Sequence, residues 1–311
     1  MRTKDLYIVW VVSFLVLITA ASSSKTYAWG EEGHRIVARI AEARLTQTAR
    51  QKINNQNLLT NIGCQNASNL ADRFACASTW ADDVRYEDTE HPESYNWHFV
   101  DISLQNTNYD HDRDCDENDP RGDCGIPALQ NLIAVLKNQN TNPKYAQYSR
   151  KKALMFIIHI VGDLHQPLHT VKEHLGGNFL FVKYANSNQK VPCFSNTNTR
   201  EKLHKIWDSC ILSQMPEANS LIQYAQGLNG EITAQDKTSY ESGSATGWLL
   251  DAHRLAIDNA YREIPTPTGS GINFRSTIPV NYYRDNEIIV ETQFKRAGIR
   301  LAKILNESFS N

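Results

Sequence analysis

The stretch RKKALMFIIHIVGDLHQPLH, residues 150–169, decides the fold class. From Ala153 to Ile158 every residue is apolar, so the segment predicts a helix that is buried on all sides at the centre of the protein. Pro167 ends this helix, because proline lacks an amide hydrogen and clashes with the preceding turn. His159 and Asp163 are four residues apart, which places an imidazole and a carboxylate on one face of the buried helix.

Most of the remaining periodic segments also repeat at helical spacing. Amphipathic helices are expected over residues 34–45, 126–137, 200–212, 248–262 and 294–305. The best strand candidate is residues 179–184, which follow the turn-prone pair Gly176-Gly177. With no internal repeat, low-complexity tract or obvious linker, the chain predicts one mainly α-helical domain with a small β-hairpin at most.

The composition is that of an ordinary globular protein. The chain has 311 residues, with 34 acidic and 32 basic residues, 41% hydrophobic residues and a formal net charge of −2. These values exclude a disordered chain, a collagen, a coiled coil and a protein with many membrane spans. They also exclude a basic protein that holds polyanions by its overall charge.

The amino terminus has the pattern of a secretory signal. Arg2 and Lys4 precede an apolar run over residues 6–21, and Thr26 and Ala28 occupy positions −3 and −1 of a cut before Trp29. We therefore expect residues 1–28 to be removed and residues 29–311 to form the exported domain, secreted or, in a bacterium, periplasmic. A cut after residue 21 or 23, or an uncleaved membrane anchor, is the alternative.

Six cysteines follow this segment, at positions 64, 76, 115, 124, 193 and 210. An even count in an exported chain indicates disulfides, and six cysteines allow 15 connectivities. The Cys115–Cys124 pair flanks a polar loop that a local bridge would stabilise, and nearest-neighbour pairing would add Cys64–Cys76 and Cys193–Cys210. Because there is no Cys-x-x-Cys pair, a structural zinc knuckle is not expected. Asn66 and Asn306 begin glycosylation sequons, which matter only in a eukaryotic host.

Histidines and aspartates recur beside apolar and aromatic segments. His204 and Asp208 repeat the i, i+4 spacing of His159 and Asp163. Either pair alone could be structural, a buried pair for the first and a surface pair for the second. Further candidates are His169 directly after the buried helix, Asp82 after Trp80-Ala81, and His98 before Phe99. Neutral imidazole and carboxylate are zinc's usual nitrogen and oxygen donors, so the set predicts a zinc site.

Six ordered motifs then resemble one known family. They are Trp29-Gly30-x-x-Gly33-His34, Trp80-Ala81-Asp82, His98-Phe99-Val100-Asp101, His159-x-x-Gly162-Asp163-x-x-Gln166-Pro167-Leu168-His169, Gly176-Gly177-Asn178 and Leu203-His204-x-x-Trp207-Asp208. The family is that of the zinc-dependent single-strand nucleases and 3′-nucleotidases of fungi and plants, which has bacterial relatives. The resemblance extends from Trp29 to the segment around Leu305.

The resemblance implies three zinc ions and nine protein ligands. Asp82, His98, His159 and Asp163 would hold one ion. The α-amino nitrogen and carbonyl oxygen of Trp29, with His34 and Asp163, would hold its neighbour, and His169, His204 and Asp208 would hold the third. Three Zn²⁺ with three aspartates leave a charge near +3, so an acidic protein could have a cationic cleft.

The same resemblance implies the catalytic and substrate-binding residues. Asp101 would orient or deprotonate a water whose pKa a zinc pair lowers toward about 7, and Arg85 would help to neutralise the transition state. Asn178 would contact phosphate or base, and Phe99 would stack on an unpaired base. Simpler roles stay open: a partner of a ligand histidine for Asp101, a salt bridge for Arg85, core packing for Phe99 and a turn for Asn178. The remaining histidines match no ligand position and are expected to be surface or structural residues: His91, His111, His165, His174 and His253.

The function implied by the resemblance is that of an exported nuclease. It would hydrolyse single-stranded DNA and RNA to 5′-mononucleotides and also hydrolyse 3′-nucleotides, as a monomer with no stable protein partner and no membrane contact after signal cleavage. The alternative enzyme is a zinc-dependent phospholipase C, against which stand the four residues between Trp29 and His34 and the aspartate at position 208. From another class, the chain could be a secreted, disulfide-bonded protein that binds metal without catalysis.

Overall fold

The fold is built around α6, the helix Arg150–Asp163. The computed structural model describes residues 29–65, 67–86, 88–185, 193–194, 199–215 and 220–310. Every residue of α6 from Ala153 to Asp163 is buried. The Ser149 side chain caps its start by accepting a hydrogen bond from the Lys152 amide, 3.2 Å away. The predicted central helix is confirmed.

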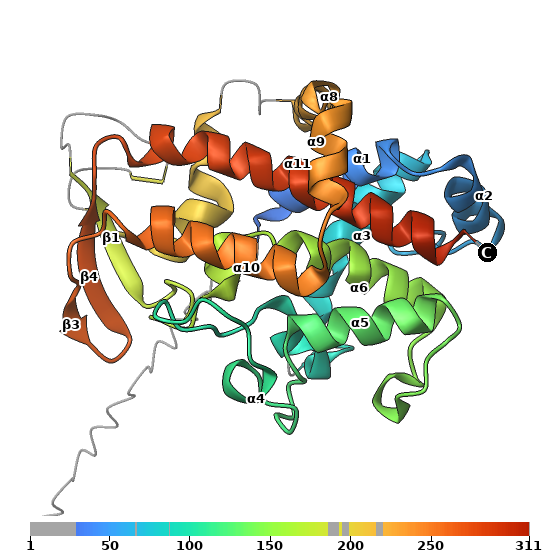
Figure 1. The fold of residues 1–311 in the computed structure, drawn as a ribbon, viewed down its shortest axis with the longest axis horizontal. Helices are drawn as coiled ribbons and strands as arrows, with labels where there is room; N and C mark the ends of the chain where they lie inside the picture. Colours follow the sequence, from blue (N-terminus) through green and yellow to red (C-terminus); the bar gives the residue numbers. More distant parts are fainter. Residues whose placement is uncertain are drawn as a thin grey trace, which may run out of the picture.

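Helices make up most of the structure (Figure 1). The α-helices are α1 Glu31–Ala43, α2 Gln47–Asn55, α3 Leu70–Val84, α4 His111–Asp114, α5 Gly125–Leu136, α6, α7 Leu203–Lys205, α8 Leu221–Glu231, α9 Ala234–Glu241, α10 Ala245–Leu255 and α11 Tyr282–Ser308. Short 3-10 helices are η1 Pro92–His98, η2 Pro143–Tyr145, η3 Pro167–Thr170 and η5 Leu212–Gln214. Among the described residues, none of these helices combines the length and apolar character needed to span a membrane.

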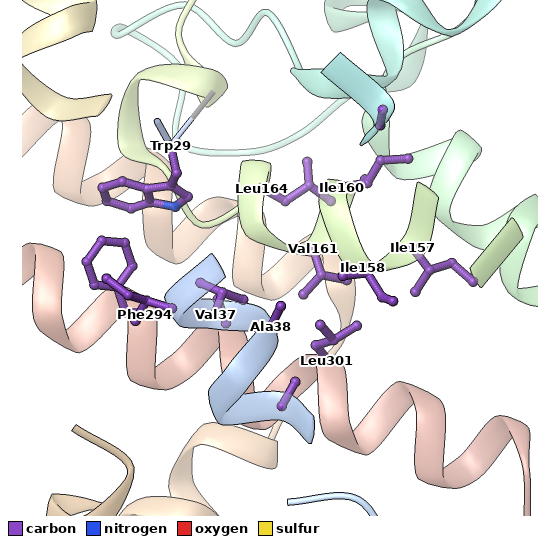
Figure 2. Packing of buried hydrophobic residues seen from close by; sticks show 14 of the residues in the cluster. Trp29, Val37, Ala38, Ile157, Ile158, Ile160, Val161, Leu164, Phe294 and Leu301 are labelled. Carbon is purple, nitrogen blue, oxygen red and sulfur yellow. The ribbon is translucent and has the colours of Figure 1, made fainter. Parts of the chain in front are cut away.

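The core forms where α1, α3, α5 and α11 pack around α6. Figure 2 shows Val37 and Ala38 of α1 and Leu301 of α11 on the side of α6 that carries Ile158 and Val161. The crossing of α1 and α11 depends on Gly298, since a Cβ there would lie 2.4 Å from Ile40 Cγ2. This packing encloses α6 and fixes the positions of the polar residues at its carboxyl end.

A small sheet covers one end of the helical body (Figure 1). Its strands are β1 Leu180–Tyr184, β2 Glu201–Lys202, β3 Thr268–Ser270 and β4 Asn273–Ile278, in the order β2-β1-β4-β3. β1 is antiparallel to β2 and parallel to β4, and β3 is antiparallel to β4. The mainly helical single domain is confirmed, but the limit of one hairpin is wrong. β2 and β3 are very short and β4 is largely polar, so these strands give little apolar alternation to read.

The expected helices agree with the structure except over residues 200–212. There, Glu201 and Lys202 form β2, and the helix begins only at Leu203. It continues as a π-helix, η4 Ile206–Cys210, in which the Ile211 amide donates to the Ile206 carbonyl at 3.0 Å. The expected helix over residues 248–262 likewise runs through α10 into a π-helix, η7 Ala256–Tyr261.

Three disulfides join sequence neighbours: Cys64–Cys76, Cys115–Cys124 and Cys193–Cys210. The nearest-neighbour connectivity is therefore the one present. Of the two sequons, Asn66 lies outside the described residues, as does the predicted signal segment 1–28. The Asn306 side chain joins α11 to the loop after α1, accepting from the Thr46 amide at 2.7 Å and donating to the Arg44 carbonyl at 3.2 Å.

Candidate metal centre

Four of the predicted ligands converge from three helices. Asp82 lies in the last turn of α3, His98 ends η1, and His159 and Asp163 lie on α6. The Oδ2 atom of Asp163 is 2.9 Å from His98 Nδ1 and 3.0 Å from His159 Nε2. These two nitrogens are 2.9 Å apart, and Asp82 Oδ1 is 3.7 Å from each. All four side chains are buried.

Charge is strongly coupled in this first group. Burial raises the pKa of Asp82 to about 6. Burial lowers the pKa of His159, but Asp163 and Asp82 outweigh it and raise that pKa to about 9. Two carboxylates enclosed together need a positive partner, either a protonated imidazole or a bound cation. The His159 ring is oriented for the second possibility, because its Nδ1 atom donates to the Ser78 carbonyl at 2.6 Å and Nε2 faces the carboxylates.

His34 of α1 approaches the other oxygen of Asp163. Its Nε2 atom is 3.1 Å from Asp163 Oδ1, and its ring stacks on His159 with centroids 4.0 Å apart. Gly162 makes room for the ring, since a Cβ there would lie 2.9 Å from His34 Nδ1. The two oxygens of Asp163 thus face two different sets of nitrogens, an arrangement that would let one carboxylate serve two ions.

Trp29 begins the described chain beside this second group. Its indole is fully buried and packs against Phe294, with ring centroids 4.7 Å apart (Figure 2). The next amide, that of Gly30, donates to the Asp208 carbonyl at 2.8 Å. The backbone at residue 29 is therefore held close to both the second and the third group.

The third group consists of His169, His204 and Asp208. The two Nε2 atoms are 3.2 Å apart, and His204 Nε2 is 3.4 Å from Asp208 Oδ2. All three side chains are buried, so the surface-pair alternative for His204 and Asp208 is wrong. His204 lies just before the π-helix η4 and Asp208 lies within it, and such π-turns recur at functional sites.

The donor set fits a metal better than it fits an apolar interior. Among the described residues, five buried atoms of the first two groups make no hydrogen bond of good geometry, although three of them have an ionic contact: His34 Nδ1 and Nε2, Asp82 Oδ1, His98 Nε2 and Asp163 Oδ1. Each such atom costs about 1–3 kcal/mol when left unsatisfied. Most of them lie at the points where imidazole nitrogens and carboxylate oxygens converge, and these are the ligands that zinc prefers.

A cavity of about 460 Å³ opens beside the third group. Its walls include the remaining predicted site residues, together with two of the ligand histidines: Arg85, Phe99, Asp101, His169, Asn178 and His204. The structure thus brings the predicted catalytic, substrate-binding and metal-binding residues to one place.

Asp101 and Arg85 line the cavity in different environments. Burial raises the pKa of Asp101 to about 6, against an opposing effect of Lys172. Arg85 Nη2 is 3.4 Å from Asp82 Oδ1, and its guanidinium lies over the rings of Tyr86 and Tyr95, 5.3 and 5.6 Å from their centroids. Arg85 therefore makes the salt bridge of the simpler interpretation and also faces the cavity.

The proposed substrate contacts, Phe99 and Asn178, are both partly exposed to the cavity. Phe99 meets Tyr95 edge to face, with centroids 6.3 Å apart, and is not enclosed in the core. Asn178 donates from Nδ2 to the Leu175 carbonyl at 3.1 Å, so it also has the turn role. It follows four residues in the left-handed region, from His174 to Gly177.

Gln166 is named in the fourth sequence motif without a role, and the structure places it against a predicted ligand. Its side chain is fully buried and donates from Nε2 to Asp208 Oδ1 at 2.7 Å. Its Oε1 atom accepts from the Leu168 amide. The sequence does give one indication of this role. Gln166 is an amide side chain between the predicted ligands Asp163 and His169, in a segment predicted to be buried, where it needs a hydrogen-bonding partner.

The five histidines without a ligand position are structural or partly exposed. His165 donates from Nδ1 to the Val161 carbonyl at 2.7 Å and accepts from Arg300, and His253 lies between the Thr170 and Asn106 carbonyls. His91 and His174 contact aromatic rings, and His111 pairs with Asp123 at 3.0 Å. The nearby Cys115 is in a disulfide, so this last pair has no thiolate to complete a metal site.

Comparisons with known proteins give the family. Residues 29–310 match the family model S1/P1 Nuclease. Endonuclease 2 of Arabidopsis thaliana is 28% identical over 98% of both chains. Nuclease S1 of Aspergillus oryzae is 29% identical over 93% of this chain and 94% of its own, and nuclease P1 of Penicillium citrinum is 27% identical over 90% and 97%. With the buried histidine–aspartate groups at one cleft, these matches show that the chain belongs to the S1/P1 nuclease family.

Proposed function

We propose that this protein is an exported, trinuclear-zinc phosphodiesterase. It hydrolyses single-stranded DNA and RNA to 5′-mononucleotides and also acts on 3′-nucleotides. The observation that carries the proposal is the convergence of three buried histidine–aspartate groups beside one cavity that Asp101 and Arg85 also line. Membership of a nuclease family and the names of the relatives support the choice of substrate.

Each group offers the ligands for one zinc ion. The first ion would be held by Asp82, His98, His159 and Asp163. The second would be held by Asp163, His34 and the amine and carbonyl of Trp29. The third would be held by His169, His204 and Asp208. Zinc in these positions supplies a Lewis acid for the phosphate and lowers the pKa of water toward neutrality. A bound zinc ion would also offset the free-energy cost of burying the ionised carboxylates.

Asp101 and Arg85 act on the reacting groups. Asp101 lies in the cavity wall as a partly buried carboxylate with a raised pKa, a state suited to accepting a proton from the attacking water near neutral pH. Arg85 presents its guanidinium beside Asp82 and can neutralise charge that develops on the phosphate oxygens. The rings of Tyr86 and Tyr95 restrict where that guanidinium can point.

Phe99 and Asn178 select the substrate. A base can stack on the Phe99 ring only when it is free of its partner strand, which favours single strands. Asn178, at the end of the Gly176-Gly177 turn, offers its amide to phosphate or base. The aromatic ring accepts any base, so little sequence preference is expected.

Signal removal during export would create one of the proposed zinc ligands. Removal of residues 1–28 would expose the α-amine of Trp29, and the family match begins at this residue. Three disulfides are consistent with an oxidising compartment. The protein would act outside the cytoplasm as a monomer.

The test uses the chain beginning at Trp29, purified and loaded with zinc. We expect three zinc ions per chain by mass spectrometry and hydrolysis of single-stranded DNA, single-stranded RNA and a 3′-nucleotide, with duplex DNA cut far more slowly. A chelator should abolish all of these activities and added zinc should restore them. Hydrolysis of phosphatidylcholine instead, or bound metal without hydrolysis of any of these substrates, would overturn the proposal.

A further inference from the structure

Two lysines of the cleft wall form no ion pair with any residue that the structure describes. Lys172 and Lys202 line the cavity, and within the part of the chain that the structure describes neither ammonium group makes a salt bridge or a side-chain hydrogen bond. The arginines of the same wall are paired: Arg85 with Asp82, Arg113 with Asp114 and Arg121 with Asp119. The lysines are therefore the cations of the cleft most available to an external anion.

The carboxylates next to the two lysines in sequence are engaged elsewhere. Glu173 accepts from the Ser103 hydroxyl at 2.6 Å and from the Leu104 amide at 3.0 Å. Glu201 pairs with Lys205 at 3.0 Å. Within the described residues neither carboxylate forms an ion pair with its neighbouring lysine, although Glu173 keeps its negative charge because its two donors are neutral.

The two lysines flank the candidate metal centre. Lys172 is close enough to Asp101 that its charge is the main influence opposing burial on the pKa of that carboxyl. Lys202 is two residues before His204, and both residues line the cavity. An anion held by these lysines would therefore occupy the same cavity as Asp101 and His204.

Backbone hydrogen bonds and strand pairing order the chain at both lysines. The Lys172 amide donates to the Ile102 carbonyl at 3.0 Å, and its carbonyl accepts from the Leu175 amide at 3.1 Å. Lys202 pairs with Phe181 of β1, and the His204 amide reaches back to Gly177 at 3.4 Å. Both side chains therefore begin from ordered backbone on the side of the cavity formed by residues 171–179.

The cavity-lining residues between positions 113 and 121 include three aspartates and two arginines, a net charge of −1. Asp114, Asp116 and Asp119 line the cavity from the segment that the Cys115–Cys124 disulfide closes. Asp116 is exposed, while Asp114 and Asp119 each neutralise an arginine. A phosphate backbone should avoid this wall and follow the lysine side, which leaves the bases free to face the aromatic rings of Phe99 and Tyr95.

We propose that Lys172 and Lys202 form a second phosphate subsite, which binds a phosphodiester adjacent to the one that is cleaved. The inference rests on the proposed nuclease function and deepens it: the enzyme favours a strand of at least three nucleotides over an isolated 3′-nucleotide. Each lysine supplies a charged hydrogen-bond donor to a non-bridging phosphate oxygen.

The test compares a trinucleotide with a 3′-nucleotide in the zinc-loaded enzyme. In the double variant Lys172→Gln/Lys202→Gln, kcat/KM for the trinucleotide should fall about tenfold relative to that for the nucleotide, as expected for lost charge-assisted contacts. The slope of log kcat/KM against log salt should become shallower by about 0.7, the value for one phosphate of a single strand. Lys172→Arg/Lys202→Arg should retain the wild-type ratio. Lys183→Gln, an exposed lysine of β1 away from the cavity, is the matched control.

A change in the substrate separates the lysine effect from general damage. The probe is a trinucleotide whose second linkage is an uncharged methylphosphonate. For the wild type, replacing the charged linkage in this way should lower kcat/KM by about as much as the double substitution lowers kcat/KM for the charged trinucleotide. In the double variant, the uncharged linkage should lower kcat/KM little further. Equal losses on trinucleotide and nucleotide, or the same additional loss with the uncharged linkage, would overturn the subsite while leaving the nuclease function intact. If the wild type cleaves neither substrate, the proposed function itself fails.

Discussion

The Nε2 atoms of His169 and His204 face one another at 3.2 Å, and neither ring has a proton to place between them. His169 donates from Nδ1 to the His98 carbonyl at 2.6 Å, and His204 donates from Nδ1 to the Gly176 carbonyl at 2.7 Å. Burial lowers the pKa of both rings, which favours their neutral forms. The lone pairs of the two Nε2 atoms repel each other in the absence of a cation, whereas a cation bound between them would be stabilised by both.

Gln166 should control the affinity of this third group for zinc. Burial raises the pKa of Asp208 well above its usual value, and the hydrogen bond from Gln166 opposes that rise. In Gln166→Ala, Asp208 should hold its proton more tightly and zinc affinity should fall about 10–100-fold. Zinc titration under a competing chelator measures the change, with the exposed Gln147→Ala as the control. Unchanged affinity would show that Gln166 only packs beside Asp208.

Gly176 should be required for both stability and the third metal. Its φ is +58°, and a Cβ would lie 2.6 Å from the Leu168 carbonyl oxygen, which is backbone. Gly176→Ala should cost about 1–3 kcal/mol in the free energy of unfolding and displace the carbonyl that orients His204. In α8, a Cβ added at Gly227 would meet no atom within 4 Å, so Gly227→Ala should stabilise by about 0.5–1 kcal/mol. Urea denaturation measures the free energy of unfolding of both variants. Similar changes in that free energy for Gly176→Ala and Gly227→Ala would refute the steric argument.

Asp101→Asn should separate catalysis from metal binding. The amide keeps the size of the side chain but cannot accept a proton, so kcat should fall about 100-fold or more while zinc content and melting temperature stay near wild type. The control is Asp116→Asn, an exposed carboxyl on the other wall of the same cavity. A variant of Asp101 with near wild-type kcat would assign that residue a structural role.

Glu93 should make stability depend on pH at the acidic end. Burial would raise the pKa of this carboxyl, but hydrogen bonds from Tyr148 and from His91 Nδ1 at 3.0 Å outweigh it, and the pKa is lowered. A lowered carboxyl pKa stabilises the fold above the unfolded value near 4.5, and this stabilisation is lost as pH falls through the folded value. Melting temperature should therefore fall less steeply below about pH 5 in Glu93→Gln than in the wild type. The exposed Glu117→Gln should retain the wild-type slope.

The sequence predicts the ligand positions on α6 better than it predicts the elements around them. His159 and Asp163 follow from apolar residues on every side of a regular helix, where i, i+4 spacing has one geometric meaning. His204 and Asp208 have the same spacing but lie across a junction of α7 and a π-helix. Nothing in their apolar pattern distinguishes a π-turn from an α-turn, because the insertion depends on contacts made elsewhere.

Most of the site features that the sequence does not predict depend on the backbone. The carbonyls of Ser78, His98 and Gly176 select the tautomers of three histidines, yet any residue type supplies a carbonyl. His174 and Leu175 adopt positive φ before Gly176, although their side chains disfavour it. The strand β4 pairs in parallel with β1 although the two strands are far apart in the chain, a contact that local pattern does not encode.

Trp29 should bind the second zinc through its α-amine and its carbonyl oxygen, which form the proposed chelate. Its indole is buried against Phe294, and the following Gly30 amide is bonded to Asp208, so the backbone at this point cannot shift to admit a substitute ligand. At Gly30 a Cβ would lie 2.6 Å from Ser209 Oγ, which shows how closely the chain packs there. An amide nitrogen cannot replace the amine, since its lone pair is delocalised into the peptide bond. Protein that retains one methionine before Trp29 should therefore fold but bind fewer zinc ions per chain and cleave single-stranded DNA slowly. Removing that methionine and adding zinc should restore both values, whereas a carboxy-terminal tag should change neither. Equal zinc content and equal rates with and without the methionine would show that Trp29 is not a ligand.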